Sequence, residues 1–309
     1  GNELDNMLVG NSGLNRLTGG AGNDTYVVGM GDTVVEGAGG GIDTIQTHIT
    51  WTLGSNLENL TLTGTDPISG IGNSLNNVVI GNAGANLLDG GSGQDRLDGG
   101  EGNDLLLGGS GHDQLAGGAG NDALNAGSGQ DFLDGGDGTD VLDAGSGDDQ
   151  LHGGSGDDVL LAGSGADRLT GGIGNDLMIG GSGNDSYLFS RGDGQDTIIE
   201  QDPFPFNQDS LEFGPTIDPL DLVLSRQADD LRIALYGTSD QVTIQNWYDG
   251  TANQTEVIVA GNGQQLLNSQ VDQLIQAMAG LTSQTGLSWE EAVAQRPDDV
   301  QAILAASWS

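Results

Sequence analysis

A repeat of nine residues, kept without insertion or deletion from Gly81 to Leu188, constrains this 309-residue chain more than any other feature. Twelve consecutive nonapeptides follow the pattern G-G-x-G-x-D-x-U-x, where U is a large apolar residue. Position 6 is Asn86 in the first nonapeptide and Asp in the other eleven, and position 8 is Leu in ten of the twelve. A phase kept over twelve nonapeptides excludes an irregular glycine-rich coil and predicts a repetitive fold.

A second period shows that the repeating unit is a pair of nonapeptides. Serine occupies position 3 of every second nonapeptide, from Ser92 to Ser182, whereas the intervening nonapeptides vary there. Glycine at positions 2 and 4 permits the positive φ of a tight turn. We therefore expect each coil to contain two unlike turns and two strands, which belong to two opposed sheets. Position 6 of one coil then lies over position 6 of the next, so that Asp95 stacks on Asp113.

The charge of the chain excludes several classes of partner. There are 45 acidic and 7 basic residues and no lysine, which gives a formal net charge of −38. Nucleic acids and anionic membrane surfaces both require a basic face, so neither is expected as a partner. The absence of cysteine excludes a disulfide framework and a thiolate zinc site. No apolar run is long enough to span a membrane, and Gly1–Gly10 lacks the features of a signal peptide.

Such acidity is typical of either a disordered polyanion or a scaffold for hard cations. The strict phase of the acids favours the scaffold. The pattern resembles the RTX (repeats-in-toxin), haemolysin-type calcium-binding repeats of bacterial secreted proteins. This resemblance implies an all-β, right-handed parallel β-roll, in which six residues of each nonapeptide turn and bind calcium while three form a strand. It also implies multiple Ca²⁺ ions, about eight or more.

The expected ligands are carboxylates at position 6 and backbone carbonyls at positions 2 and 4. The carboxylates are Asp95, Asp104, Asp113, Asp122, Asp131, Asp140, Asp149, Asp158, Asp167, Asp176 and Asp185. The carbonyls are those of Gly91, Gly93, Gly100, Gly102, Gly109, Gly111, Gly118, Gly120, Gly127, Gly129, Gly136, Gly138, Gly145, Gly147, Gly154, Gly156, Gly163, Gly165, Gly172 and Gly174. Three further candidate ligands outside this array are Asp24, Asp193 and Asp196.

The remaining segments predict coils before the main array and a cap after it. Residues 1–27 form degenerate repeats, 28–71 longer coils, 72–188 the calcium-binding roll, 189–280 a β-rich cap and 281–309 a helical tail. The last coil of an open solenoid needs such a cap. Helices are expected over residues 271–279 and from Ser288, which has Glu291 in capping-box spacing. Asp298 is expected to cap a last helical turn before Trp308.

The order of segments from 185 to 280 resembles the C-terminal block of large RTX toxins such as adenylate cyclase toxin. This resemblance implies that the C-terminal end nucleates folding of the roll and carries an uncleaved signal for type I secretion. Residues 281–309 match that block more loosely and are a candidate for the signal.

Motifs of the common catalytic centres are missing. The three histidines do not belong to H-E-x-x-H, and the sequence has no G-x-S-x-G elbow, P-loop or EF-hand loop. We therefore expect no catalysis by this chain. A calcium-triggered Asp-Pro self-processing module stays an alternative, with candidate bonds Asp66–Pro67, Asp202–Pro203 and Asp218–Pro219.

These observations favour a calcium-dependent folding and secretion module. We expect a monomer that is unfolded in a low-calcium cytosol, passes the type I secretion machinery, and folds outside the cell or on the bacterial surface. The chain would be the C-terminal part of a larger exported toxin or adhesin, whose other parts could bind a host or cell-surface ligand. The alternative parent is a secreted protease, lipase or epimerase with its catalytic domain upstream.

Overall fold

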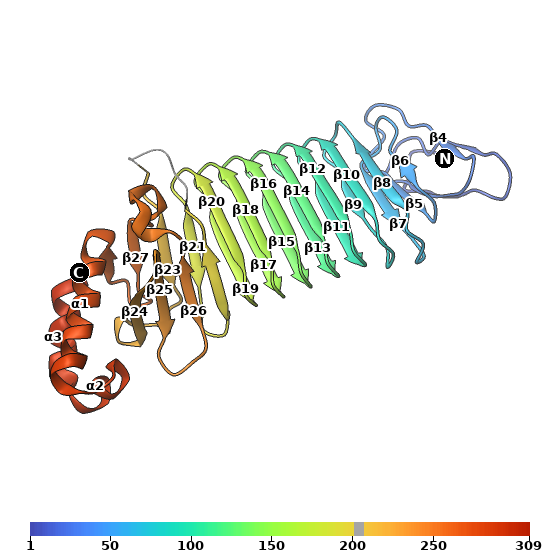
Figure 1. Ribbon diagram of the computed structural model, residues 1–309. Helices are drawn as coiled ribbons and strands as arrows, with labels where there is room; N and C mark the ends of the chain where they lie inside the picture. The colour runs from blue at the N-terminus through green and yellow to red at the C-terminus, as the bar shows by residue number, and fades with distance from the viewer. Residues whose placement is uncertain (201–206) are drawn as a thin grey trace. The chain divides into compact units, whose positions relative to one another are not determined.

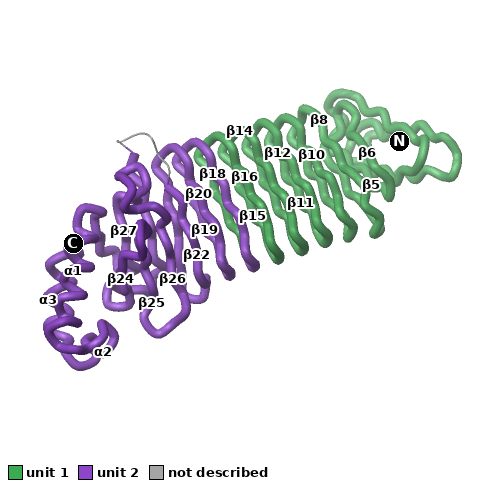
Figure 2. Tube along the Cα trace, viewed as in Figure 1, with its two compact units in different colours: residues 1–154 green, residues 155–309 purple. Residues whose placement is uncertain are grey.

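The computed structural model describes residues 1–200 and 207–309, which divide into two compact units, Gly1–Gly154 and Ser155–Ser309 (Figure 2). Strands are the most abundant secondary structure in both units, and α-helices occur only at the C-terminal end of the second among the described residues.

Unit 1 is a parallel β-roll built from two sheets (Figure 1). One sheet has the order β1-β3-β5-β7-β9-β11-β13-β15-β17 and the other β6-β8-β10-β12-β14-β16, while β2 and β4 form a small separate pair. From β8 onward, successive strands alternate between the two sheets, as two strands per coil require. The strands are β1 (Met7–Val9), β2 (Arg16–Leu17), β3 (Thr25–Val28), β4 (Thr33–Val34), β5 (Thr44–Thr47), β6 (Trp51–Thr52), β7 (Asn59–Leu62), β8 (Ser69–Asn73), β9 (Val78–Ile80), β10 (Leu87–Ser92), β11 (Arg96–Glu101), β12 (Leu105–Ser110), β13 (Gln114–Ala119), β14 (Ala123–Ser128), β15 (Phe132–Asp137), β16 (Val141–Ser146) and β17 (Gln150–Ser155).

The register of the strands confirms the predicted coil of two nonapeptides. Leu88 of β10 pairs with Leu106 of β12, and Ser92 pairs with Ser110. Each strand of the array spans six residues rather than the three that were expected. The expectation was wrong because the pairing continues through positions 2 and 3, which the prediction had assigned wholly to the turn.

Position 8 forms the core between the two sheets. The leucines at this position in unit 1, from Leu88 to Leu151, are at most 2% exposed. Only this side chain and the small residue at position 1 are buried in most strands, so each coil contributes little apolar area. The narrow core explains why the array needs a further source of stability.

Strands of the irregular coils before the array also pair within the parallel sheets. Thr25 of β3 pairs with Thr44 of β5, and Thr44 pairs with Asn59 of β7. The first of these steps is longer than a regular coil and the second is shorter. Such unequal steps hide the coils from a search for a nine-residue phase, although their strands alternate buried and half-buried residues.

Unit 2 begins with parallel coils of the same kind and ends in antiparallel strands. Its two sheets have the orders β19-β21-β23-β27-β28 and β18-β20-β22-β26-β25-β24. The pairs β24–β25, β25–β26 and β27–β28 are antiparallel. The strands are β18 (Val159–Ser164), β19 (Arg168–Ile173), β20 (Leu177–Ser182), β21 (Ser186–Phe189), β22 (Gln195–Ile198), β23 (Ser210–Phe213), β24 (Leu222–Gln227), β25 (Asp230–Leu235), β26 (Gln241–Ile244), β27 (Val257–Val259) and β28 (Gln265–Leu267).

The cap, residues 208–309, has a conventional apolar core. Strand β25 buries Leu231, Ile233 and Leu235 on one face, and the indole of Trp247 is buried as well. Phe189 and Phe213 meet edge to face, with ring centroids 6.0 Å apart. Closure of the sheets by antiparallel hairpins and side-chain packing confirms the predicted β-rich cap.

Three helices complete the cap: α1 (Asn268–Thr285), α2 (Trp289–Gln295) and α3 (Pro297–Ser307). The predicted capping box at α2 is present, because the Glu291 amide donates to Ser288 Oγ and the Ser288 amide donates to Glu291 Oε2. The prediction that Asp298 caps the last turn was wrong. Proline tolerates the first helical position, so α3 begins at Pro297 and Asp298 lies inside its first turn.

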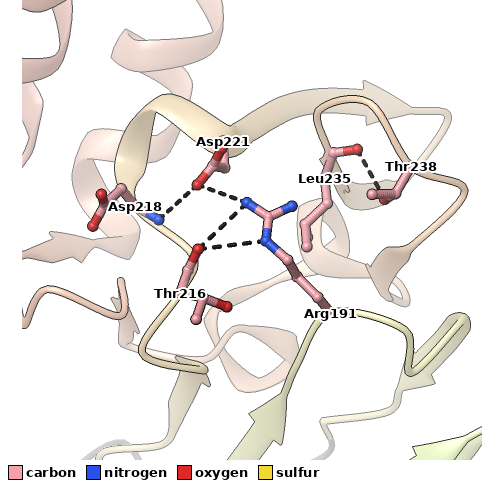
Figure 3. Close-up of polar contacts among 6 residues, drawn as sticks. All are labelled: Arg191, Thr216, Asp218, Asp221, Leu235 and Thr238. Carbon is pink, nitrogen blue, oxygen red and sulfur yellow. Dashed lines mark hydrogen bonds and ion pairs between the residues drawn. The ribbon is translucent and has the colours of Figure 1, made fainter.

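An ion pair joins the end of the parallel coils to the cap (Figure 3). The Arg191 guanidinium lies 2.9 Å from Asp221 Oδ2 and donates to the Thr216 carbonyl at 3.4 Å. The Asp218 amide donates to the same carboxylate at 3.0 Å. This corner of the cap therefore uses a conventional charge pair, unlike the array.

Candidate metal centre

Each turn of the array is built by two glycines with positive φ. At Gly109 and Gly111 the φ values are 105° and 145°, and a side chain at Gly111 would overlap the carbonyl oxygen of Gly93 in the preceding coil. The Gly93 carbonyl thus faces the next coil. It lies near Asp113 Oδ1, because a methyl group added at Gly111 would also come within 3.4 Å of that carboxylate oxygen. The structure therefore brings position-4 carbonyls and position-6 carboxylates to the same part of the turn.

The aspartates at position 6 form a continuous hydrogen-bonded ladder in each unit. In unit 1, the Asp95 amide donates to Asp113 Oδ1 at 2.8 Å and the Asp113 amide donates to Asp131 Oδ1 at 2.7 Å. In unit 2, the Asp167 amide donates to Asp185 Oδ1 at 2.9 Å. These bonds place the carboxylates one above another, one coil apart, as the repeat predicted. All eleven aspartates are at most 3% exposed.

The second carboxylate oxygen is unusual in this ladder. Oδ2 is buried and accepts no hydrogen bond in Asp95, Asp104, Asp113, Asp122 and Asp131. The ion pairs found among the described residues use other carboxylates, so no arginine neutralises these five. A buried charge without a partner costs several kcal/mol. The ladder therefore lacks a positively charged component.

Burial raises the pKa of ladder carboxylates, as expected for buried charges that have no positively charged partner. Desolvation, together with neighbouring ladder carboxylates, raises the pKa of Asp113, Asp140 and Asp149 from the ordinary value of 3.8 to about 6. Desolvation also raises the pKa of Asp95 and Asp104. These groups resist ionisation unless a cation stands beside them.

The residues present suit a hard divalent cation. Each ladder position offers a carboxylate oxygen and carbonyl oxygens, which are the ligand types that Ca²⁺ prefers. Among the described residues, no group of three or more His, Asp or Glu side chains is arranged to hold a metal by itself. A cation here would therefore take two stacked carboxylates and complete its shell with backbone carbonyls.

The three candidates outside the array have different places in the structure. Asp24 and Asp196 join the ladders: the Asn6 amide donates to Asp24 Oδ1 at 2.7 Å, and the Asp176 amide donates to Asp196 Oδ1 at 3.0 Å. Desolvation and the Asp176 carboxylate raise the pKa of Asp196 to about 8. Asp193 instead accepts the Ser190 amide within its own turn at 2.6 Å.

Sequence reasoning missed four acids that extend the ladder beyond the nonapeptides. Asp43 accepts the Asp24 amide, and Glu58 accepts the Asp43 amide at 2.9 Å. In unit 2 the corresponding acids are Asp209, which accepts the Asp185 amide at 2.8 Å, and Glu256, which accepts the Asp209 amide at 2.9 Å. The sequence did contain a usable signal. Asp43 and Asp209 each begin a motif of Asp, Ser or Thr, and a large side chain, as Asp24 and Asp185 do.

The remaining candidates for chemistry are not part of the carboxylate ladders. His112 lies beside the ladder residues Asp113 and Asp131, but it is exposed and its Nδ1 accepts the Gln130 amide at 2.7 Å. Of the Asp-Pro bonds, Asp202–Pro203 lies outside the described residues, while Asp218 and Pro219 begin a short 3₁₀ helix, η1 (Pro219–Asp221). No helix of the described chain is both long and apolar enough to cross a membrane.

Two protein families match the sequence. The family described as RTX calcium-binding nonapeptide repeat (4 copies) matches in overlapping segments that together cover more than half of the chain. These segments are residues 1–35, 71–106, 99–133, 107–142, 116–151, 134–169, 152–187 and 161–198. The haemolysin-type calcium binding protein related domain matches residues 230–263, which lie in the cap.

One similar solved structure is the crystal structure of the extracellular lipase LipA from Serratia marcescens. It is 20% identical to this chain, with a TM-score of 0.23, and the similarity covers 65% of this chain and 42% of the lipase chain. This chain thus corresponds to less than half of the length of that lipase.

Proposed function

Because this chain belongs to the RTX calcium-binding nonapeptide repeat family, we propose that it is a folding module whose β-roll forms only when Ca²⁺ fills the aspartate ladders. The carboxylate ligands are the eleven position-6 aspartates together with Asp24 and Asp196, and the position-2 and position-4 carbonyls complete each site. Asp193 is a weaker candidate, because its carboxylate serves its own turn.

The observation that carries this proposal is the row of buried Oδ2 atoms without a hydrogen-bond partner, from Asp95 to Asp131 in unit 1. Without a cation, stacked carboxylates repel one another and lose their hydration, while each coil buries little apolar area to compensate. With Ca²⁺, the same atoms become ligands. Binding to the folded state alone then stabilises that state by mass action.

The biological role follows from the different calcium levels inside and outside a cell. In a low-calcium cytosol, a chain with net charge −38 would stay extended enough to pass a type I secretion channel. Outside, calcium near 10⁻³ M matches the affinity of about 10⁻⁴ to 10⁻³ M that is typical of extracellular modules. We infer that the chain is the C-terminal folding region of a larger exported toxin, adhesin or enzyme. The five sequence segments from 1–27 to 281–309 stay predictions within this proposal.

Far-ultraviolet circular dichroism with calcium and with excess EDTA tests the proposal. We expect strand signal in calcium, loss of the share that the coils contribute on chelation, and its return when calcium is restored. Magnesium at the same concentration should not restore it, because Mg²⁺ demands strict octahedral geometry and keeps its waters. A strand signal that does not fall on complete chelation would disprove the proposal.

A further inference from the structure

The last turn of the first repeat block is followed by an irregular coil that copies the geometry of the ladder. The turn of this coil, residues 38–43, lies over the turn formed by residues 19–24. The Asp24 amide donates to Asp43 Oδ1 at 2.8 Å, the same distance as between Asp95 and Asp113. Gly41, with φ of 143°, faces the Gly22 carbonyl as Gly111 faces the Gly93 carbonyl. A turn of the array's type therefore exists where the nonapeptide pattern ends.

The two aspartates of this coil have oxygens ready for a ligand. Asp24 is 1% exposed and Asp43 is fully buried, and Oδ2 of each accepts no hydrogen bond. Desolvation and the neighbouring carboxylates of Glu36, Asp24 and Glu58 raise the pKa of Asp43. None of the ion pairs among the described residues involves these acids.

A tyrosine and a glutamate distinguish this coil from those of the array. In the array, a side chain at Gly117 would lie 2.5 Å from Asp122 Oδ2 and 2.6 Å from the Gly135 carbonyl of the next coil. At Gly19 the corresponding neighbours are Asp24 Oδ2 and the Tyr26 hydroxyl, so the hydroxyl replaces the carbonyl that the next regular coil would have supplied.

The tyrosine hydroxyl also positions a further carboxylate. It accepts the Gly19 amide at 2.7 Å and donates to Glu36 Oε1, and the Gly19 amide also donates to Glu36 at 2.6 Å. These bonds hold a third buried carboxylate, which interacts electrostatically with Asp43.

The same set of residues recurs independently in unit 2. Tyr187 accepts the Gly180 amide at 2.9 Å, Asp185 donates its amide to Asp209, and Glu200 is buried beside Tyr187 with an electrostatic contact to Asp209. Two blocks of one chain thus end in the same combination of aspartate, tyrosine and glutamate, which argues for a shared role.

We propose that residues 38–43 complete an additional divalent-cation site in unit 1, with Asp24 and Asp43 as its carboxylate ligands and Glu36 as a third negative charge, and that this site binds Ca²⁺ more tightly than the ladder does. The inference rests on the proposed function, because it takes the ladder to be a calcium site. Within a continuous ladder, each carboxylate is shared by the cations on either side, so every cation has about one carboxylate charge. The block end differs because Asp24 stacks on the uncharged Asn6 on its other side, so its carboxylate serves a single cation, while Glu36 adds a negative charge near Asp43. Calcium affinity rises with the charge around the ion. Asp185, Asp209 and Glu200 form the counterpart in unit 2.

Calcium binding to the full chain, titrated in calcium-buffered solutions, tests this inference. Wild type should show a tight class of sites ahead of the ladder. Asp43→Asn should remove one ion from the tight class, and Asp209→Asn should remove its counterpart. Glu36→Gln keeps both ligands, so it should retain the number of ions and weaken the tight class about tenfold. Glu3→Gln is the matched control, because it removes one charge from an exposed residue near the same end.

A second measurement keeps the inference testable if Asp43→Asn fails to fold. Terbium, which replaces calcium, should luminesce on excitation of tyrosine in wild type at the lowest occupancies, and Tyr26→Phe should reduce this emission. Titrations of Asp43→Asn and Glu36→Gln that overlay a calcium-binding wild type would overturn the inference and leave the proposed function intact. A wild type that binds no calcium would instead overturn the proposed function and this inference together.

Discussion

The regular coils of unit 1 and the cap of unit 2 are both β-structures, but they use opposite means to satisfy their buried groups. Between Arg96 and Ser146, the coils bury one large apolar residue per strand together with an aspartate whose second oxygen lacks a partner in several coils. The cap buries whole faces of its strands, and its Asp221 pairs with Arg191 at the end of the parallel coils. The comparison teaches that strand content says little about what stabilises a sheet. Under the proposed function the coils depend on a cation, whereas the cap depends on apolar burial.

The largest expected effect is a difference in amide protection after calcium removal. Excess EDTA should abolish hydrogen-exchange protection in β11 to β16, because the stacked carboxylates then repel one another without compensation. Amides of β25 and β26 should keep measurable protection, because their core of Leu231, Ile233 and Val242 needs no cation. Hydrogen exchange with mass spectrometry measures both regions in one sample. Equal loss of protection in the two regions would show that the cap also depends on calcium.

Glycine substitutions should sharpen the comparison within a single nonapeptide. Gly111→Ala places a methyl group against the Gly93 carbonyl at a φ of 145°, so it should destabilise the calcium-loaded roll by roughly 3 kcal/mol or more. Gly108→Ala should cost less, about 1–2 kcal/mol, because its φ is not positive and Ala126 occupies the same position in the next coil, although the methyl group would lie 2.6 Å from Asp113 Oδ2. Calcium concentration at the folding midpoint is the measurement. Similar midpoints for the two variants would contradict the account of the turn.

Lowering the pH should stabilise the metal-free roll and destabilise the calcium-loaded roll. The pKa of Asp113, Asp140 and Asp149 is raised from 3.8 to about 6 in the folded chain, so the folded state holds protons that the unfolded chain has released. In EDTA, lowering the pH from about 7 to about 5 should therefore increase strand content. In calcium, the same change should raise the calcium midpoint, because protons compete for the ligands. Circular dichroism at both pH values measures this, and a shift of the same sign in both buffers would refute it.

The smallest effect concerns the charge pair of the cap. Arg191→Met removes the ion pair with Asp221 while keeping an apolar stem, and both partners are partly exposed, so the expected loss is about 1 kcal/mol or less. The calcium midpoint should change little. Asp113→Asn is the comparison variant, because it removes a ladder ligand and should raise that midpoint clearly. Equal shifts for the two variants would mean that the cap shares the electrostatics of the ladder.

Much of the roll could be predicted because its determinants are local and periodic. Asp113 and Leu115 recur at fixed positions, and a coil of two nonapeptides can stack them in only one register, which the Asp95–Asp113 hydrogen bond confirms. Asp43 was missed because its coil is longer than a regular one, so its stacking depends on the path of the intervening loop. The role of Glu36 could not be predicted at all, because it depends on the three-dimensional position of the Tyr26 hydroxyl.

The constant length of the regular coils has a consequence for how such a chain can change its size. Every turn of the array contacts its neighbours through the same pairs of positions, so an in-frame loss of residues 108–125 would join two turns that already fit one another. A duplication of one coil would be equally neutral in geometry. A loss of a single nonapeptide would instead move every later strand to the other sheet and bring unlike turns together. Recombination between similar coils can therefore lengthen or shorten this protein in whole steps, and the number of coils is free to vary independently of the cap.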